Sequence, residues 1–208
     1  QAHYRAAIDH FKRFERVLRP VRESMNNLAI AYLKQGLLKL GTGDSPLNRW
    51  QSKLSIEKSL SLKFVPVRAV RITKRTRSMA KKATKSRKPR PIPLEIRQSI
   101  RILKKTVRRY PTYAKAHLNL VAAYLAARQL KRAQSALKKV DAKGQGGTYH
   151  VVAGIVHAES KNIPAAQKSF DEALKRSETK QAATYNRARL FDVAGRQAEA
   201  KKAYEAYL

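Results

Sequence analysis

Apolar residues recur along the second half of the chain at the three- and four-residue spacing of amphipathic helices. Between residues 114 and 208, small and bulky residues also return to the same relative places at a nearly fixed period. The first set is Leu120, Tyr124, Ala133 and Leu137; 33 residues later come Ala153, His157, Ala166 and Phe170, and 34 residues after those come Arg187, Phe191, Ala200 and Tyr204. A period of this length predicts an array of similar helical units.

Each period contains two helical stretches separated by a short turn, predicted at residues 127–130, 161–164 and 194–197. The alanines at 133, 166 and 200 are small where two helices cross closely. The bulkier side chains at 124, 157 and 191 fill the interior of each pair. The second half of the chain is therefore predicted to be a row of helical hairpins, and the fold to be all-α.

This pattern resembles the tetratricopeptide repeat. The second helix of that family has an Ala-x-x-x-aromatic-x-x-Ala pattern, which is present at Ala166, Phe170 and Ala173, and the last copy matches through Gly195 and Ala200. The resemblance implies a right-handed α-solenoid of helix-turn-helix repeats. It also implies a scaffold for protein partners rather than an enzyme.

The resemblance extends upstream, where one repeat is interrupted. Residues 27–36 are similar to a first helix, and residues 95–110 are similar to its second helix. Residues 4–18, with Ala7, Phe11 and Phe14, resemble the second helix of a preceding copy, so we expect the chain to begin within a repeat. About four and a half degenerate copies result. The expected segments are residues 1–36 with the N-terminal repeat helices, 37–93 with an insertion, and 94–208 with the remaining repeats.

The insertion divides into parts by composition. Asp44 and Pro46 provide a helix cap and a first-turn proline, which predicts a short amphipathic helix at residues 46–60. Residues 63–73 mix Val and Ile with Arg and Pro, as is typical of an extended stretch. Residues 63–90 contain 12 Lys or Arg and no acidic residue, so we expect this tract to be disordered on its own.

Charge defines the class of partner. The formal net charge is +32 on 208 residues, which calls for a negatively charged partner. The helix predicted at 95–110 adds a positive stripe to the basic tract. For the stripe alone a solvated outer face is favoured over a binding surface, whereas for the basic tract a binding surface is favoured. The residues expected to bind an anionic partner are Lys63, Arg68, Arg71, Lys74, Arg75, Arg77, Lys81, Lys82, Lys85, Arg87, Lys88, Arg90, Arg97, Arg101, Lys104, Lys105 and Arg108.

The sequence contains no convincing pattern of catalytic or metal-binding residues. The chain has no cysteine, which excludes disulfides, thiolate metal sites and cysteine nucleophiles. His150 and His157 share one helical face, but their equivalents in other copies include Tyr124 and Phe191, which favours packing over metal binding. The glycine-rich stretches 41–44 and 144–147 lack the Lys-Ser/Thr of a phosphate loop. We expect no enzymatic activity, no cofactor and no metal.

In the tetratricopeptide family, first helices line a groove that takes extended or helical peptides. The resemblance implies a lining of Asn27, Ile30, Leu118, Asn119, Ala122, Leu125, Val151, Ile155, Tyr185, Asn186 and Arg189. The asparagines recur in register and either hydrogen-bond a peptide backbone or only cap and solvate the helices. The family's clamp for a terminal carboxylate is not reproduced, so an apolar peptide or helix is the expected occupant.

Three functions remain open on this sequence. The first is a scaffold subunit of a larger assembly, with a protein in the groove and the basic insertion on an anionic surface. The second is a ribonucleoprotein subunit that binds phosphate backbone non-specifically, although Phe64 is the one aromatic residue in the basic tract. The third is an envelope or periplasmic protein bound to acidic lipid or glycan. Apolar runs such as 118–127 are shorter than the roughly 20 residues that span a bilayer, and the compartment stays open.

Overall fold

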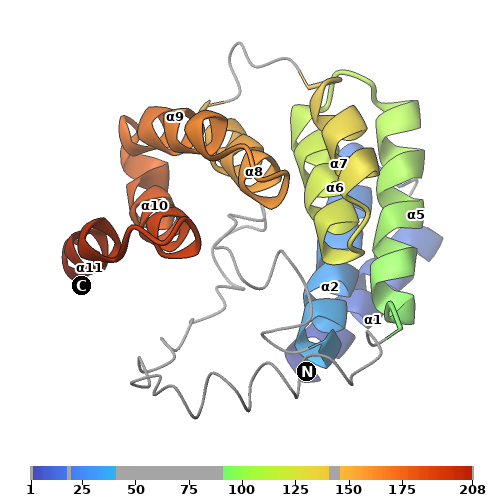
Figure 1. The fold of residues 1–208 in the computed structure, drawn as a ribbon. Coiled ribbons are helices and arrows are strands. Elements are labelled where there is room, and N and C mark those ends of the chain that lie inside the picture. The colour runs from blue at the N-terminus through green and yellow to red at the C-terminus, as the bar shows by residue number, and fades with distance from the viewer. Residues whose placement is uncertain (1, 18–19, 41–90, 141–145, 208) are drawn as a thin grey trace. The chain divides into compact units, whose positions relative to one another are not determined.

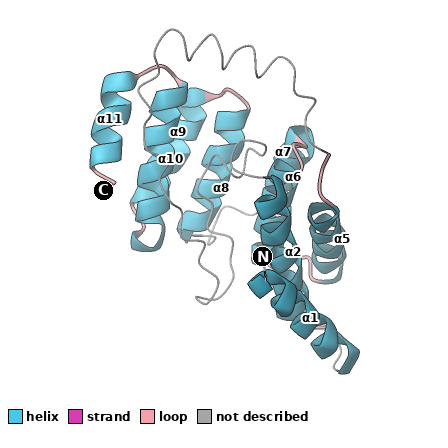
Figure 2. Cartoon of the chain, turned by 90° about the horizontal axis from the view of Figure 1, so that it is seen from below, coloured by secondary structure: helices cyan, strands magenta, loops and turns pink. Residues whose placement is uncertain are grey.

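The computed structural model describes residues 2–17, 20–40, 91–140 and 146–207. Within these ranges all regular structure is helical, as Figures 1 and 2 show. The helices are α1 (Ala2–Val17), α2 (Arg22–Leu40), α5 (Leu94–Arg109), α6 (Ala114–Ala126), α7 (Leu130–Leu137), α8 (Gly146–Glu159), α9 (Ile163–Leu174), α10 (Lys180–Val193) and α11 (Gln197–Glu205). A short 3-10 turn, η2 (Ser177–Thr179), precedes α10. The all-α prediction is confirmed.

The helices form hairpins that stack on one another. α6 packs on α7, α8 on α9, and α10 on α11. First helices of neighbouring hairpins also touch, because α6 contacts α8 and α8 contacts α10. Figure 2 shows α8, α9, α10 and α11 following one another as adjacent helices. This is the arrangement of an α-solenoid, in which each hairpin buries apolar surface against the next.

The turns inside three hairpins share one backbone geometry. Their central residues, Arg128, Lys161 and Gly195, have φ values of 58°, 62° and 77° in the left-handed region. In each turn the next N–H donates to a carbonyl five residues earlier. These bonds are Gln129 N to Tyr124 O at 2.8 Å, Asn162 N to His157 O at 3.0 Å, and Arg196 N to Phe191 O at 2.9 Å. They are the six-to-one bonds of a Schellman motif, which ends a helix and turns the chain. The predicted turns are thus correct in position and alike in conformation.

The hairpin of α2 and α5 closes without a short turn. A side chain at Gly36 would collide with Ile96, since an added Cβ would lie 2.5 Å from Ile96 Cγ1, so glycine allows the two helices to touch. Lys39 also pairs with Glu95 across the hairpin. α2 continues to Leu40, beyond the expected boundary at residue 36, because Leu37 and Leu40 are both buried. The helix predicted at 46–60, the extended stretch at 63–73 and the basic tract at 63–90 lie outside the described residues.

The core runs through the first helices of the hairpins. In α6 every residue from Leu118 to Ala126 is buried, and α8 is buried from Val151 to Val156. The alanines predicted at the helix crossings, Ala133, Ala166 and Ala200, are at most 3% exposed. Ser99, Leu103 and Thr106 of α5 are also fully buried. Small residues at the crossings therefore allow the close packing that the repeat pattern indicated.

The register of α1 agrees with the expectation in part. Of the three residues that the resemblance selected, Ala7 and Phe11 pack against the buried cluster of Ile8, Leu28 and Ala31, but Phe14 does not. Phe14 is 37% exposed, and Ala7 and Phe11 are only partly buried. Among the described elements α1 has its main contact with α2, and Ile102 of α5 packs against the same cluster.

The left-handed turns predict a stabilising substitution. An L-residue at a left-handed φ costs about 1–2 kcal/mol, and glycine avoids most of this strain at some cost in chain entropy. Lys161→Gly should therefore raise the free energy of unfolding by about 1 kcal/mol, measured by urea denaturation. The control is Lys168→Gly within α9, at an exposed helical position, which should lower it by about 1 kcal/mol. Equal losses in both variants would contradict the proposed strain at Lys161.

Candidate functional site

The expected groove residues fall into two groups in the structure. Three are partly exposed, namely Asn27, Tyr185 and Arg189. The other eight are buried: Ile30, Leu118, Asn119, Ala122, Leu125, Val151, Ile155 and Asn186. Five of these eight belong to the main hydrophobic cluster of the protein. The sequence pattern correctly marks them as residues of the first helices, but their side chains stabilise the fold in this structure.

One asparagine has a structural partner that the sequence register missed. Asn119 donates from Nδ2 to Oδ1 of Asn26 at 2.8 Å, and both side chains are buried. The register had selected Asn27, which is partly exposed. Two adjacent asparagines cannot be distinguished by a repeat period that varies by one residue. The bond joins α2 to α6 between neighbouring hairpins, so here the asparagine packs helix against helix.

The C-terminal part of the expected groove is an aromatic cluster. The Tyr185 ring contacts the rings of Tyr204 and Tyr207, with centroids 6.0 and 5.5 Å away. Arg189, one turn after Tyr185 on α10, donates from Nη1 to Asp192 Oδ2 at 2.7 Å. Burial raises the pKa of the Tyr185 phenol above its ordinary value. Tyrosine and arginine in this setting provide a rigid, amphipathic surface of the kind that is enriched in protein interfaces.

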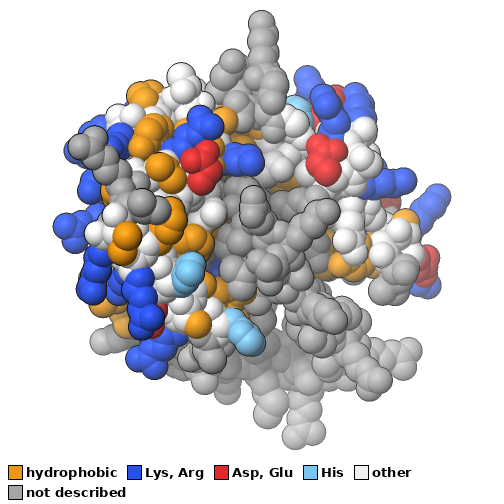
Figure 3. Space-filling view, turned by 180° about the vertical axis from the view of Figure 1, so that it is seen from behind, with side chains coloured by type: hydrophobic (Ala, Val, Ile, Leu, Met, Phe, Trp, Pro, Cys, Tyr) orange, Lys and Arg blue, Asp and Glu red, His pale blue; other side chains and the backbone are white. Residues whose placement is uncertain are grey.

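The cationic residues predicted on α5 are all exposed. Apart from Leu94, every exposed residue of α5 is Lys or Arg. These cations, which we call the cationic face of α5, are Arg97, Arg101, Lys104, Lys105, Arg108 and Arg109. Within the described part of the chain, none of the six forms an ion pair. Figure 3 shows the same imbalance more widely, since Lys and Arg side chains predominate over Asp and Glu on the face it presents. The other twelve predicted anion-binding residues, 63–90, lie outside the described residues.

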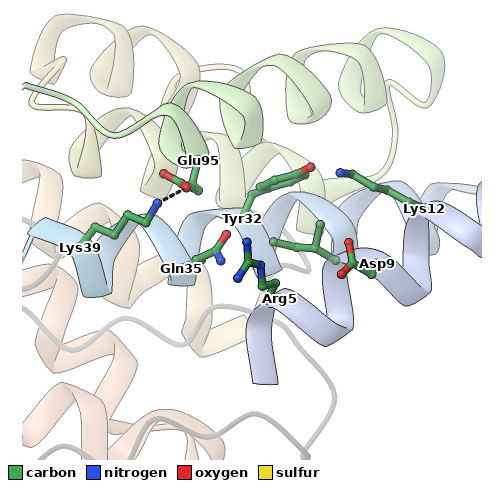
Figure 4. A pocket seen from close by; sticks show the side chains of 8 residues that line it. Arg5, Asp9, Lys12, Tyr32, Gln35, Lys39 and Glu95 are labelled. Carbon is green, nitrogen blue, oxygen red and sulfur yellow. Dashed lines mark hydrogen bonds and ion pairs between the residues drawn. The ribbon is translucent and has the colours of Figure 1, made fainter. Parts of the chain in front are cut away.

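A cavity between α1, α2 and α5 was not predicted from the sequence. It measures about 640 Å³ and is lined by Arg5, Ile8, Asp9, Lys12, Tyr32, Gln35, Lys39 and Glu95. Figure 4 shows Arg5, Asp9 and Lys12 on α1 facing Tyr32, Gln35 and Lys39 on α2, with Glu95 at the start of α5. The three polar residues of α1 have a four- and then three-residue spacing, which places them on one helical face. That spacing was visible in the sequence, but only the fold shows what it faces.

The Lys39–Glu95 pair sets the electrostatics at one end of this cavity. Partial burial raises the pKa of Glu95, but the hydrogen bonds from Lys39 and from its own backbone outweigh burial, so the pKa lies below its usual value. The side chain of Glu95 is 16% exposed and that of Lys39 is 46% exposed. The pair is therefore partly shielded from water and joins the two helices of the interrupted hairpin.

The two histidines singled out in the sequence lie on α8. His150 and His157 are both partly exposed, and the His150 ring contacts the Tyr149 ring edge to face at 5.3 Å between centroids. Among the described residues, no group of three His, Cys, Asp or Glu side chains is placed to hold a metal ion. No described helix is both long enough and apolar enough to cross a membrane.

The buried asparagine pair predicts a measurable coupling. Asn119→Ala removes the donor to Asn26 Oδ1 and should cost about 1–3 kcal/mol of unfolding free energy, because a buried acceptor is left unsatisfied. In a double-mutant cycle with Asn26→Ala, the loss of unfolding free energy in the double variant should differ from the sum of the two single losses by about 0.5–1.5 kcal/mol. Asn27→Ala is the matched control and should change stability by less than about 0.5 kcal/mol. Additive losses from Asn26 and Asn119 would contradict the coupling.

The lowered pKa of Glu95 predicts how stability depends on pH. Glu95 stabilises the fold above its unfolded pKa, and this contribution is lost as the pH falls through the lower folded pKa. Glu95→Gln should therefore be less stable than the wild type at pH 7, by up to about 1 kcal/mol. The difference should shrink in acid, as measured by urea midpoints at neutral and acidic pH. Glu205→Gln, in an exposed pair with Lys201 at 3.9 Å, should show little difference at either pH.

Comparisons with known proteins agree on the fold. Two tetratricopeptide repeat models match, one at residues 95–150 and the other at residues 151–208, and together they cover more than half of the chain. A crystal structure of a thermophilic tetratricopeptide repeat protein from Thermus thermophilus is similar, with a TM-score of 0.65 and 20% sequence identity. The match covers 100% of this chain and 82% of that one. No curated protein matches the sequence. With its stacked hairpins, equivalent turns and matching repeats, the chain belongs to the tetratricopeptide repeat family.

Proposed function

We propose that this protein is a non-catalytic adaptor in a larger assembly, which holds a protein partner and fastens it to an anionic surface. Tetratricopeptide repeats are scaffolds for protein interaction in general, and the fold is typically non-catalytic. The proposal of an anionic surface rests on the cationic face of α5. Its exposed side is almost wholly Lys and Arg and, among the described residues, meets no carboxylate.

The cationic face has the dimensions of a polyanion contact. From Arg97 to Arg108 it extends for about 16 Å along the helix axis, at 1.5 Å per residue. Like charges at three- and four-residue spacing repel one another, so they destabilise the helix when no counter-charge is present. A polyanion would remove this repulsion and would release counterions as it bound. The acidic residue of α5, Glu95, is engaged with Lys39 and does not neutralise the face.

The composition of the exposed side favours a phosphate backbone among the possible anions. Helices that lie in a bilayer interface present a broad apolar face beside their cations. α5 exposes one apolar side chain, Leu94, at its first turn. Binding to the phosphate backbone of RNA is therefore the second candidate function. Such binding would not depend on sequence, because the cationic face has no aromatic side chain on which bases could stack. Acidic lipid or glycan in an envelope would gain electrostatic attraction alone.

For the protein partner, the accessible part of the expected groove is on α10. Tyr185 and Arg189 are partly exposed, and Val193, one turn further on, is 56% exposed. Their four-residue spacing places them on one face of the helix. We assign the protein-binding role to this face, and we assign a structural role to the buried residues of α2, α6 and α8.

Charge removal on α5 tests the proposal. Arg97→Gln/Arg101→Gln/Lys105→Gln should weaken binding to a uridine oligonucleotide and reduce the slope of log affinity against log salt by about 2, measured by fluorescence anisotropy. The matched control, called the α7 control, removes one exposed lysine of α7 and the two that follow the helix, Lys131→Gln/Lys138→Gln/Lys139→Gln, with the same change in net charge. It should keep nearly the wild-type slope.

Two outcomes decide against parts of the proposal. An equal loss of oligonucleotide affinity in the α7 control would show that net charge alone drives binding. It would contradict a specific role for the cationic face of α5. Stronger binding to anionic lipid vesicles than to RNA, lost in the α5 variant, would replace the RNA alternative by a membrane surface. A variant that lacks residues 63–90, measured in parallel, reports how much the basic tract adds.

A further inference from the structure

The cavity between α1, α2 and α5 has walls of different chemistry. Ile8 is 4% exposed, lines the cavity and packs with Leu28 and Ala31, so one wall of the cavity is apolar. The Tyr32 ring is partly buried and lies under the Lys12 ammonium, whose Nζ is 5.8 Å from the ring centroid. A volume of about 640 Å³ is within the usual range for a ligand site, roughly 300–1,000 Å³.

The charged groups of the cavity are unevenly matched. Lys39 and Glu95 neutralise each other at the α5 end. At the α1 end two cations, Arg5 and Lys12, share the cavity with one carboxylate, Asp9. None of these three forms an ion pair with another described residue. In Figure 4 the side chain of Arg5 extends toward Gln35. The α1 end therefore offers an excess of donors together with one carboxylate acceptor.

This combination restricts the chemistry of a ligand. A simple inorganic anion would gain from Arg5 and Lys12 but would be repelled by Asp9. An apolar ligand would remove all three charges from water without replacing their hydrogen bonds. An acidic peptide offers a partner to both kinds of charge. Its side-chain carboxylates can accept two parallel hydrogen bonds from a guanidinium, and its backbone N–H groups can donate to a carboxylate. Its aliphatic carbons can lie against Ile8 and Tyr32.

We propose that this cavity binds an acidic segment of a partner protein in extended conformation. Arg5 and Lys12 hold its carboxylates, Asp9 and Gln35 hold its backbone, and the Lys39–Glu95 pair bounds the site. This site is separate from the face of α10 and from the cationic face of α5, so it adds a contact to the proposed adaptor. Occupation would also fix α1 against the α2–α5 hairpin, because the bound segment would touch all three helices.

The probe is a capped, fluorescein-labelled peptide of alternating glutamate and alanine, with a glutamine-for-glutamate peptide as its neutral match. Binding to the full chain is measured by fluorescence anisotropy. Arg5→Gln/Lys12→Gln should weaken glutamate-peptide binding roughly tenfold or more. Arg13→Gln/Arg16→Gln, at exposed positions of α1 that do not line the cavity, should leave it within about twofold. Lys12→Gln alone should give a smaller loss in the same direction.

Asp9→Asn separates a peptide site from a general anion site. This substitution should weaken binding of the glutamate peptide, because residue 9 no longer offers a carboxylate to the backbone N–H groups of the peptide. It should strengthen binding of inorganic phosphate, because a negative charge is removed from the cavity. Three results would overturn the proposal: equal losses in the Arg13/Arg16 control, equal binding of the glutamine peptide, or tighter glutamate-peptide binding by Asp9→Asn. Full retention of peptide binding by the α5 triple variant would confirm that this site is independent of the proposed anionic surface.

Discussion

The structure depends on enclosing helices that are apolar around most of their circumference. α6 and α8 present Leu, Val, Ile and Ala around most of their circumference, so neither could stay in contact with water on any broad face. Each must be covered by its own second helix and by the neighbouring hairpins, and this requirement produces the stacking. The small residues at 133, 166 and 200 then decide how closely the covering helices approach.

The sequence predicts most of the fold because its period is set by this packing. The turns at 127–130, 161–164 and 194–197 follow from spacing alone, and the second helix predicted at 95–110 is present as α5 despite the long interruption. The period carries less information where packing is incomplete. Phe14 is expected in a packed register, but α1 is covered mainly by α2 and its register is not repeated by a second neighbour. Asn26 was missed because the register varies by one residue between copies.

The candidate sites were harder to predict for two different reasons. The positive charges on α5 were recognised, since a stripe of cations on a helix with a buried opposite side has one possible orientation. The groove was predicted from family geometry, and a repeat pattern that reports which residues belong to a first helix does not report which remain accessible. The cavity was not found because it needs three helices from two parts of the chain, and no local pattern records that Arg5 and Glu95 line the same space.

The α2–α5 pair closes through direct contact rather than through its connecting chain. Gly36 against Ile96 and Lys39 against Glu95 hold the two helices together across more than 50 residues of sequence. The entropy lost in closing a loop rises by only about 0.6 kcal/mol for each doubling of its length. Folding therefore places little demand on how long the connector is or which residues it contains. Evolution was free to shape that stretch for another purpose, and its extreme basicity is what such freedom would allow.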